Sequence, residues 1–235
     1  MKYSIVIPAY NEEARIENTV RDYADFVSRT WEPGTAEVLV VVNGSRDCTG
    51  EIARRLEAEL EIVRSWETKA RLGKGGAVLQ GFDLAEGEIL AFTDADNATA
   101  PLQLKRLLDA VEAGTDAAIG SRWLPESVQE IPQPFSRRVA SRVFNLIVRL
   151  LFQMQFKDTQ CGAKAFRRRA IEAVRKEIQS HGWAFDVELI WKMQKRGFAV
   201  QEVPIVWRDS SQSRIRMHKD GPAMLIELLK LRLRR

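Results

Sequence analysis

Cysteine is scarce in this chain, and long apolar runs are missing from it. The 235 residues include two cysteines, Cys48 and Cys161, which are too few for a disulfide framework and fit no zinc-binding spacing. We therefore expect two reduced thiols in a cytoplasmic protein. No apolar stretch reaches the roughly 18 residues that a membrane-spanning helix needs. The N-terminus runs directly into a strand-like segment, so no signal peptide is expected.

Glycine and proline are not enriched either, and we find no low-complexity run or internal repeat. Apolar residues make up 45% of the chain and charged residues 29%, as in an ordinary folded domain. The net charge is only +4, but the basic residues gather from Arg122 onward. A basic second half suits nucleic acid, anionic lipid or a phosphorylated substrate. Aromatic residues do not alternate with the basic ones as in single-strand binders, so no nucleic-acid partner is expected.

The first 120 residues alternate between strand-like and helical patterns. Apolar, β-branched runs predict strands at 3–8, 37–42, 61–65, 88–93 and 116–120. Helical spacing or helix-start signals predict helices at 12–28, 47–60, 75–84 and 101–113. Continuous apolar strands separated by helices indicate an α/β, Rossmann-like fold, a mostly parallel sheet with helices on both faces.

The second half is less regular. Three prolines in 124–135 predict a loop, and helices are expected at 136–154, 185–196 and 222–233. Residues 163–166 are interpreted as an edge strand, and residues 199–207 are strand-like. No clean linker is present, so we predict one domain over residues 1–235 with a C-terminal helical elaboration.

Ligands of such sheets bind outside the carboxyl ends of the strands. Asp94 and Asp96 follow the fourth predicted strand there, and their charges repel unless a cation offsets them. Mg²⁺ or Mn²⁺ suits such oxygen ligands and often shares them with substrate phosphates. A metal here would neutralise charge on a departing nucleoside diphosphate. Taken alone, the D-x-D pattern is also typical of a solvated turn.

A glycine-rich segment, Lys74-Gly75-Gly76-Ala77, opens the third predicted helix. Backbone N–H groups at a helix start, together with Lys74, favour an anion, although many helices simply begin with glycines. The chain has no G-x-x-x-x-G-K-[ST] phosphate loop. It also has no G-x-G-x-x-G after the first strand, which argues against a dinucleotide enzyme.

Four segments in order resemble the signature of family 2 glycosyltransferases, which have the GT-A fold. They are VIPAYNEE (6–13), VVNGSRDCTGEIA (41–53), GKGGAV (73–78) and FTDADNAT (92–99). Later segments are similar to the polyprenyl-phosphate branch, that of the dolichyl-phosphate glucosyltransferases and mannose synthases. These are GSRW (120–123), RRVASRVFN (137–145), KDTQCGAKAFRR (157–168), WAFDVELIW (183–191) and EVPIVWRDSSQSR (202–214). DTQCG and FDVEL look closer to the glucosyl side.

The resemblance implies a donor site and a metal site. The donor site would comprise Pro8, Ala9, Tyr10, Glu12, Asn43, Ser45, Lys74, Asp94, Ala95, Asp96 and Arg214. Asp96 would ligate Mg²⁺ or Mn²⁺ directly, while Asp94 would reach the ribose or Lys74 and support the metal. Asn97 is a weaker third metal candidate. Asn43 stands where the family usually has Asp to meet the base. Arg214 would close over the diphosphate, with Arg208 as a weaker candidate.

The resemblance also implies an acceptor site. Arg122 and Arg137 would hold the acceptor's phosphate, or they are solvated surface arginines, and Arg138 could replace Arg137. A phosphate acceptor is already anionic, so positioning and electrostatics would be the main catalytic contributions and Asp158 would be structural or position the acceptor. A hydroxyl acceptor would instead need Asp158 or Asp186 as general base.

We expect an inverting enzyme that moves a hexose from UDP-glucose or GDP-mannose to polyprenyl phosphate. The alternatives are transfer to a hydroxyl of a glycan or glycolipid, and a non-catalytic sugar-nucleotide-binding protein. Residues 1–120 would bind the donor, and residues 121–235 would bind the acceptor and face the membrane. Segments 136–154 and 224–235 carry apolar residues with basic ones among them, which suits peripheral contact with the cytoplasmic face of a membrane or ordinary core packing.

Overall fold

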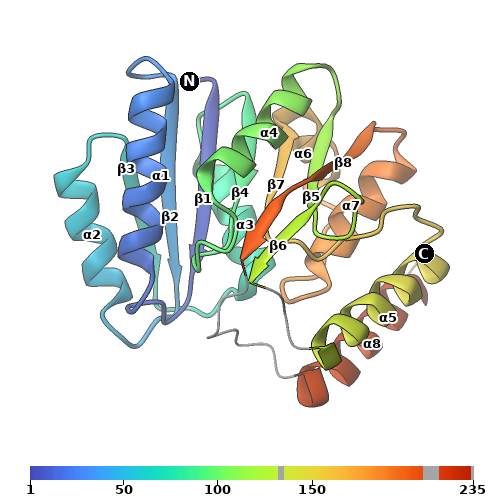
Figure 1. Ribbon diagram of the computed structural model, residues 1–235. Coiled ribbons are helices and arrows are strands. Elements are labelled where there is room, and N and C mark those ends of the chain that lie inside the picture. The colour runs from blue at the N-terminus through green and yellow to red at the C-terminus, as the bar shows by residue number, and fades with distance from the viewer. Residues whose placement is uncertain (132–134, 209–216, 234–235) are drawn as a thin grey trace.

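The computed structural model describes residues 1–131, 135–208 and 217–233, and for residues 136, 137 and 217–223 the description covers the backbone only. Strands and helices alternate through the first half of the chain, as the sequence predicts (Figure 1). The elements of that half are β1 (Tyr3–Ala9), α1 (Ile16–Thr30), β2 (Ala36–Asn43), α2 (Thr49–Glu59), β3 (Val63–Thr68), α3 (Gly73–Leu84), β4 (Ile89–Phe92), α4 (Pro101–Glu112) and β5 (Ala117–Ser121). The second half contains β6 (Val128–Ile131), α5 (Phe135–Phe152), β7 (Lys164–Arg167), α6 (Arg168–Arg175), α7 (Phe185–Lys195), β8 (Val200–Pro204), β9 (Val206–Arg208) and α8 (Met217–Leu233).

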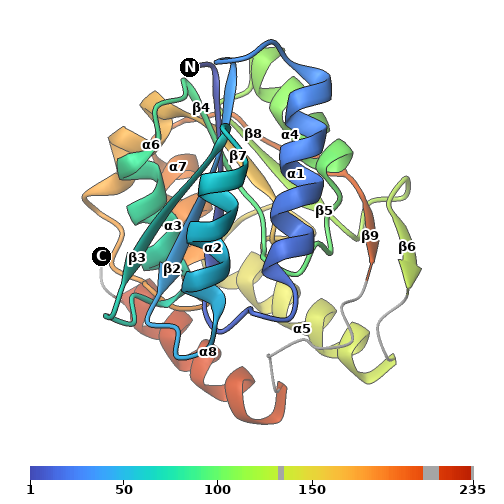
Figure 2. The ribbon, with the colours of Figure 1, turned by 90° about the vertical axis from the view of Figure 1, so that its left-hand side faces the viewer.

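Seven strands form the central sheet in the order β3-β2-β1-β4-β7-β5-β8. Every pairing is parallel except the two that β7 makes with β4 and β5. One apolar core joins the sheet to α1, α2 and α4, and a second joins its other face to α3, α6 and α7. Figure 2 shows the sheet between these two layers of helices. The predicted mostly parallel sheet with helices on both faces is therefore confirmed.

The helical elaboration consists of α5 and α8, which lie together beside the main body, on the side where β1, β2 and β4 end (Figure 1). A third apolar cluster, which includes Val148, Trp191 and Leu228, joins them to α7. Across residues 1–131, 135–208 and 217–233, we find no helix with the length and apolarity needed to span a bilayer.

Three expectations for the second half were wrong. The segment at 163–166 is not an edge strand, because β7 lies between β4 and β5 and Lys164 is buried in an ion pair that the pattern did not reveal. The expected loop at 124–135 contains β6, which pairs with β9 in a separate two-stranded sheet. The single strand expected at 199–207 is divided into β8 and β9 around Ile205. The sequence reading also missed α6, a short helix that carries Arg168, Arg169 and Arg175.

Close packing of α3 on the sheet depends on Gly81. A Cβ atom at this position would lie 2.3 Å from Cγ1 of Val6 on β1 and 3.1 Å from Cγ2 of Val41 on β2. Interiors at native density tolerate no such overlap without backbone or rotamer shifts. The contact matters for the site because the N-terminal end of the same helix carries Lys74.

We expect Gly81→Ala to lower the free energy of unfolding by about 1–3 kcal/mol because the added methyl group overpacks the core. Denaturant unfolding measures the effect. Val6→Ala removes the clashing methyl groups, so the double variant should be at least about 0.5 kcal/mol more stable than the sum of the two single changes implies. Strictly additive effects would contradict this account of the α3 contact.

Candidate active site

A pocket of about 360 Å³ opens at the carboxyl ends of β1, β2 and β4. Residues from both halves of the chain line it. Those anticipated from the sequence are Pro8, Tyr10, Glu12, Asn43, Lys74, Asp94, Ala95, Asp96 and Arg122. The side chains of Arg137 and Arg214, which the sequence also suggested, lie outside the described residues. The parallel strands thus bring together residues that are more than 100 positions apart.

Lys74, at the start of α3, connects two carboxylates. Its Nζ atom lies 3.0 Å from Oδ1 of Asp94 and 3.5 Å from Oδ2 of Asp186. Asp186 in turn accepts a 2.5 Å hydrogen bond from the fully buried Lys164. Burial acts to lower the pKa of Lys74, but Asp186 and Asp94 outweigh it and raise that pKa. Lys74 is therefore a permanent cation beside Asp94.

Asp94 also lies directly against the backbone of Gly162. A Cβ atom at position 162 would be 1.8 Å from Oδ2 of Asp94, so only glycine leaves room for the carboxylate. The loop before β7 thereby holds Asp94 from one side while Lys74 holds it from the other. Both contacts fix the direction in which this carboxylate faces the pocket.

Asp96 is the second carboxylate of the pair and fits a divalent cation. Burial and the neighbouring charge of Asp94 together raise the pKa of Asp96, which means that the site favours an added positive charge. Within the described parts of the chain, no three Asp, Glu, His or Cys side chains are grouped closely enough to hold a metal. Two carboxylates with phosphate oxygens and water as further ligands are the arrangement that Mg²⁺ commonly adopts.

The amide of Asn43 presents one polar atom to the pocket. Its Nδ2 group donates to the carbonyl of Ala9 at 3.0 Å, which makes Ala9 a support for this side chain. Its Oδ1 atom is buried and has no hydrogen-bond partner among the described residues. Such an orphaned acceptor costs about 1–3 kcal/mol unless a ligand donates to it. Asn43 therefore acts as an acceptor toward whatever binds here.

The loop after β1 is held by hydrogen bonds to the loop after β2. The Oγ atom of Ser45 accepts from the backbone N–H of Asn11 at 2.9 Å, and Asn11, at φ +51°, accepts in return from the N–H of Arg46. Glu12 is fixed by a 2.7 Å bond from its N–H to Oγ1 of Thr49. Ser45 does not line the pocket, so the structure places it as a loop support.

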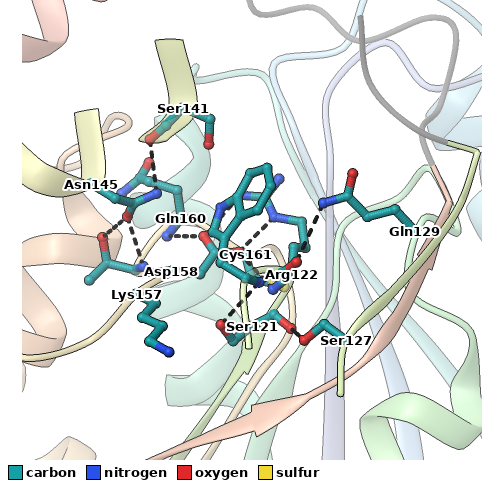
Figure 3. A network of polar contacts seen from close by, with 12 residues as sticks. Ser121, Arg122, Ser127, Gln129, Ser141, Asn145, Lys157, Asp158, Gln160 and Cys161 are labelled. Atoms are coloured by element: carbon teal, nitrogen blue, oxygen red, sulfur yellow. Dashed lines mark hydrogen bonds and ion pairs between the residues drawn. The ribbon is translucent and has the colours of Figure 1, made fainter. Parts of the chain in front are cut away.

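Arg122 lines the pocket and is paired with the buried carboxylate of Asp158 behind it (Figure 3). The guanidinium donates to both carboxylate oxygens of Asp158, at 2.7 and 2.9 Å, and the Arg122 backbone N–H donates to Oδ2 at 3.0 Å. Burial acts to lower the pKa of Arg122, but the adjoining Asp158 carboxylate raises it. The guanidinium also lies 5.4 Å from the ring of Trp207. Arg122 is thus a fixed cation.

The two carboxylates considered as general bases are both engaged in buried ion pairs. Asp158 is fully buried and bound in bidentate fashion by Arg122. Asp186 is 1% exposed, and although burial acts to raise its pKa, Lys164 and Lys74 lower it overall. A proton acceptor must reach its donor directly or through one water and have a pKa near the working pH. Neither carboxylate is placed for that role.

Two further candidate residues, Asn97 and Arg208, point elsewhere. Asn97, at φ +54°, donates its amide to Asp22 of α1 and lies outside the pocket lining. Arg208 pairs with Glu130 of β6.

Sequence reasoning missed two residues that line the pocket, Arg71 and Gln160. The guanidinium of Arg71 lies 4.6 Å from the ring of Tyr10. Arg71 stands in a loop with no pattern, and only its place two residues before the GKGG segment could have signalled it.

An α/β fold of this kind with paired aspartates, a buried lysine and a fixed arginine in one pocket defines a glycosyltransferase of the GT-A type. The family model described as "Glycosyl transferase family 2" matches residues 4–175. The chain belongs to this family, as the ordered motifs of the sequence suggested.

Similar proteins support this assignment. Glycosyltransferase AglD of Haloferax volcanii is 38% identical over 98% of this chain, although the chain spans only 37% of that protein. The polyprenol monophosphomannose synthase of Mycolicibacterium smegmatis is 35% identical, with 87% of this chain and 77% of that protein covered. The dolichyl-phosphate beta-glucosyltransferase of Saccharomyces cerevisiae is 30% identical, with 98% and 74% covered.

Solved structures confirm the GT-A fold. Glucosyl-3-phosphoglycerate synthase from Mycobacterium tuberculosis, crystallised with Mn²⁺, UDP and phosphoglyceric acid, superposes with a TM-score of 0.75 at 22% identity. The match covers 98% of this chain and 78% of that one. A crystal structure of the same enzyme with Mn²⁺ and UDP-glucose has a TM-score of 0.73.

We expect Gly162→Ala to weaken the binding of UDP with Mn²⁺ about tenfold or more, because the new methyl group must displace Asp94 from Lys74. Calorimetric titration measures the affinity. Gly182→Ala is the matched control, since it lines the same pocket and its Cβ would meet nothing closer than Glu227 at 3.5 Å. Equal affinities for the two variants would refute the role given to Asp94.

Proposed function

We propose that this protein is an inverting hexosyltransferase that moves glucose or mannose from a nucleoside diphosphate to polyprenyl phosphate. The observation that carries the proposal is the ion pairing of Asp158 with Arg122 and of Asp186 with Lys164. A hydroxyl acceptor needs a general base, and both candidate carboxylates are locked in buried ion pairs. A phosphate monoester is already an anionic nucleophile and needs none, and its natural counter-charge is Arg122.

The donor's diphosphate would lie near Asp94 and Asp96. These two carboxylates would hold Mg²⁺ or Mn²⁺, which would offset the charge on the departing nucleoside diphosphate. Lys74 adds a second, permanent cation on the same side, 3.0 Å from Asp94. Because these groups are fixed before the substrate binds, little reorganisation is needed as charge develops on the leaving group.

The base of the donor would be recognised at Asn43. Its unpartnered Oδ1 atom requires an N–H group from the ligand. Uracil and guanine both carry a ring N–H on their Watson–Crick edge that could donate to it. This agrees with UDP-glucose or GDP-mannose as donor. Tyr10, with Arg71 over its ring, would give the base a face to stack on.

The acceptor would approach from the second half of the chain, at Arg122, while residues 1–120 contribute most of the donor side. Ser141 and Phe144 of α5 and Met224 of α8 border the same pocket. A polyprenyl chain leaving the pocket would therefore meet these two helices. We place Arg137 with Arg122 at the acceptor phosphate, and Arg214 over the diphosphate, from the family resemblance.

The outer faces of α5 and α8 suit a membrane surface. Phe135, Val139, Val143, Leu146 and Leu150 are all exposed on α5, at spacings of four, four, three and four residues that place them on one face. Ile226, Leu229 and Leu233 are exposed on α8. Arg142, Arg149 and Lys230 are exposed among them, which complements anionic lipid. We propose peripheral binding at the cytoplasmic face, where free thiols such as Cys48 and Cys161 persist.

We expect Leu150→Glu to reduce sedimentation with vesicles of phosphatidylcholine and phosphatidylglycerol by about tenfold or more, because a leucine side chain leaves the lipid interface. Leu150 is 72% exposed, so the thermal unfolding midpoint should not change. Leu102→Glu on α4 is the control, since that leucine is 57% exposed but away from α5 and α8. If both variants lost vesicle binding equally, or neither did, this membrane face would be wrong.

The function itself is tested by incubating the protein with Mg²⁺ or Mn²⁺, farnesyl phosphate and each sugar nucleotide in turn. Mass spectrometry of the lipid should show one added hexose. We expect Asp96→Ala to lower this turnover by about 10²-fold or more without unfolding the protein, and Asp109→Ala on the surface of α4 to leave it unchanged. Product with hydroxyl acceptors alone would favour the glycan or glycolipid alternative, and binding without turnover would favour a non-catalytic protein.

A further inference from the structure

Gln160 has a buried donor that nothing in the described structure engages. Its Nε2 group is buried and has no hydrogen-bond partner among the described residues, yet the residue lines the pocket. A buried N–H left unpaired costs about 1–3 kcal/mol. The unpaired amide at the pocket wall is explained if a bound ligand supplies an oxygen that accepts its hydrogen bond.

The position of Gln160 is set by the same carboxylate that holds Arg122. The backbone N–H of Gln160 donates to Oδ1 of Asp158 at 3.3 Å, while the Arg122 guanidinium occupies both oxygens of that carboxylate. Figure 3 shows the three residues in one network. Asp158 therefore holds both the Arg122 guanidinium and the backbone of Gln160.

A second anchor ties this loop to α5. The Oδ1 atom of Asn145 accepts from the backbone N–H of Thr159 at 3.1 Å and from its hydroxyl at 3.3 Å. Asn145 is 3% exposed, so both bonds are shielded from water. The backbone that carries the Gln160 side chain is thus anchored at Asp158 and, through Thr159, at Asn145.

We propose that Gln160 is a positioning and specificity residue for the acceptor, and that its carboxamide donates a hydrogen bond to a phosphate oxygen of polyprenyl phosphate beside Arg122. Two of the five guanidinium N–H groups bind Asp158, and the others remain for the same phosphate. A phosphate has several acceptor oxygens and can take donors from both side chains. The amide adds direction without adding charge, and a hydrogen bond to an anionic phosphate oxygen is stronger than one to a neutral alcohol oxygen. This inference rests on the proposed function.

The test compares Gln160→Met with Gln160→Glu, using farnesyl phosphate and UDP-glucose or GDP-mannose, whichever the wild-type protein uses. Loss of one hydrogen bond to a charged oxygen should raise the acceptor KM about 10- to 100-fold in Gln160→Met. Gln160→Glu should raise it further, because a carboxylate repels the phosphate. The donor KM and the affinity for UDP with Mn²⁺ should stay within about twofold. Gln201→Met, an exposed position on β8, is the control for the chemical change.

These measurements distinguish a failure of the role given to Gln160 from a failure of the proposed transferase function. If the wild-type protein transfers no sugar to farnesyl phosphate, the proposed function fails and this inference falls with it. If the wild type does transfer sugar but Gln160→Met keeps its acceptor KM, the inference alone is overturned. A raised donor KM with an unchanged acceptor KM would also overturn it, because it would place Gln160 at the transferred sugar. Equal loss of every parameter with a lowered unfolding midpoint would reduce Gln160 to a structural residue.

Discussion

The active site depends on a series of alternating charges, Asp94, Lys74, Asp186 and Lys164, which runs from the pocket at Asp94 to the buried pair of Asp186 and Lys164. The series connects the end of β4, the start of α3, the start of α7 and the central strand β7. A buried charge is costly unless it is paired, so Lys164 and Asp186 require each other, and Lys74 extends the series to Asp94. The result is that Asp94 is held in place while its neighbour Asp96 still favours an added cation.

The pocket separates charge in a way that suits glycosyl transfer between two phosphates. In the proposed function, the paired aspartates and Lys74 would serve the donor, and Arg122, with its charge maintained by Asp158, would serve the acceptor. Two anionic substrates can approach each other only where cations offset their repulsion. In the proposed function the protein supplies fixed cations for both, while Asp158 and Asp186 are held in buried ion pairs. Positioning and electrostatics then supply the main contributions to rate.

Prediction from sequence succeeded where the local pattern and the burial agreed. In the first half, apolar runs became parallel strands within a few residues of their expected ends. It failed where tertiary contacts overrode the pattern. Lys164 made β7 look like an edge strand, because its charge is neutralised by a residue 22 positions away. The prolines of 124–135 suggested a loop, although β6 forms there by pairing with β9. Gln160 was quoted within a motif, but nothing local showed that its amide lacks a partner.

The sequence by itself determined the fold class, the four ordered motifs and the pairing of carboxylates after the fourth strand. Each of these features depends on residues that are close together in the chain. Only the tertiary structure decided what the carboxylates are free to do. Asp158 is bound by Arg122, 36 positions earlier, and the orientation of Asn43 is set by a carbonyl on another strand. Ionisation and hydrogen-bonding capacity depend on the groups within a few ångströms of an atom, and folding alone brings those groups together.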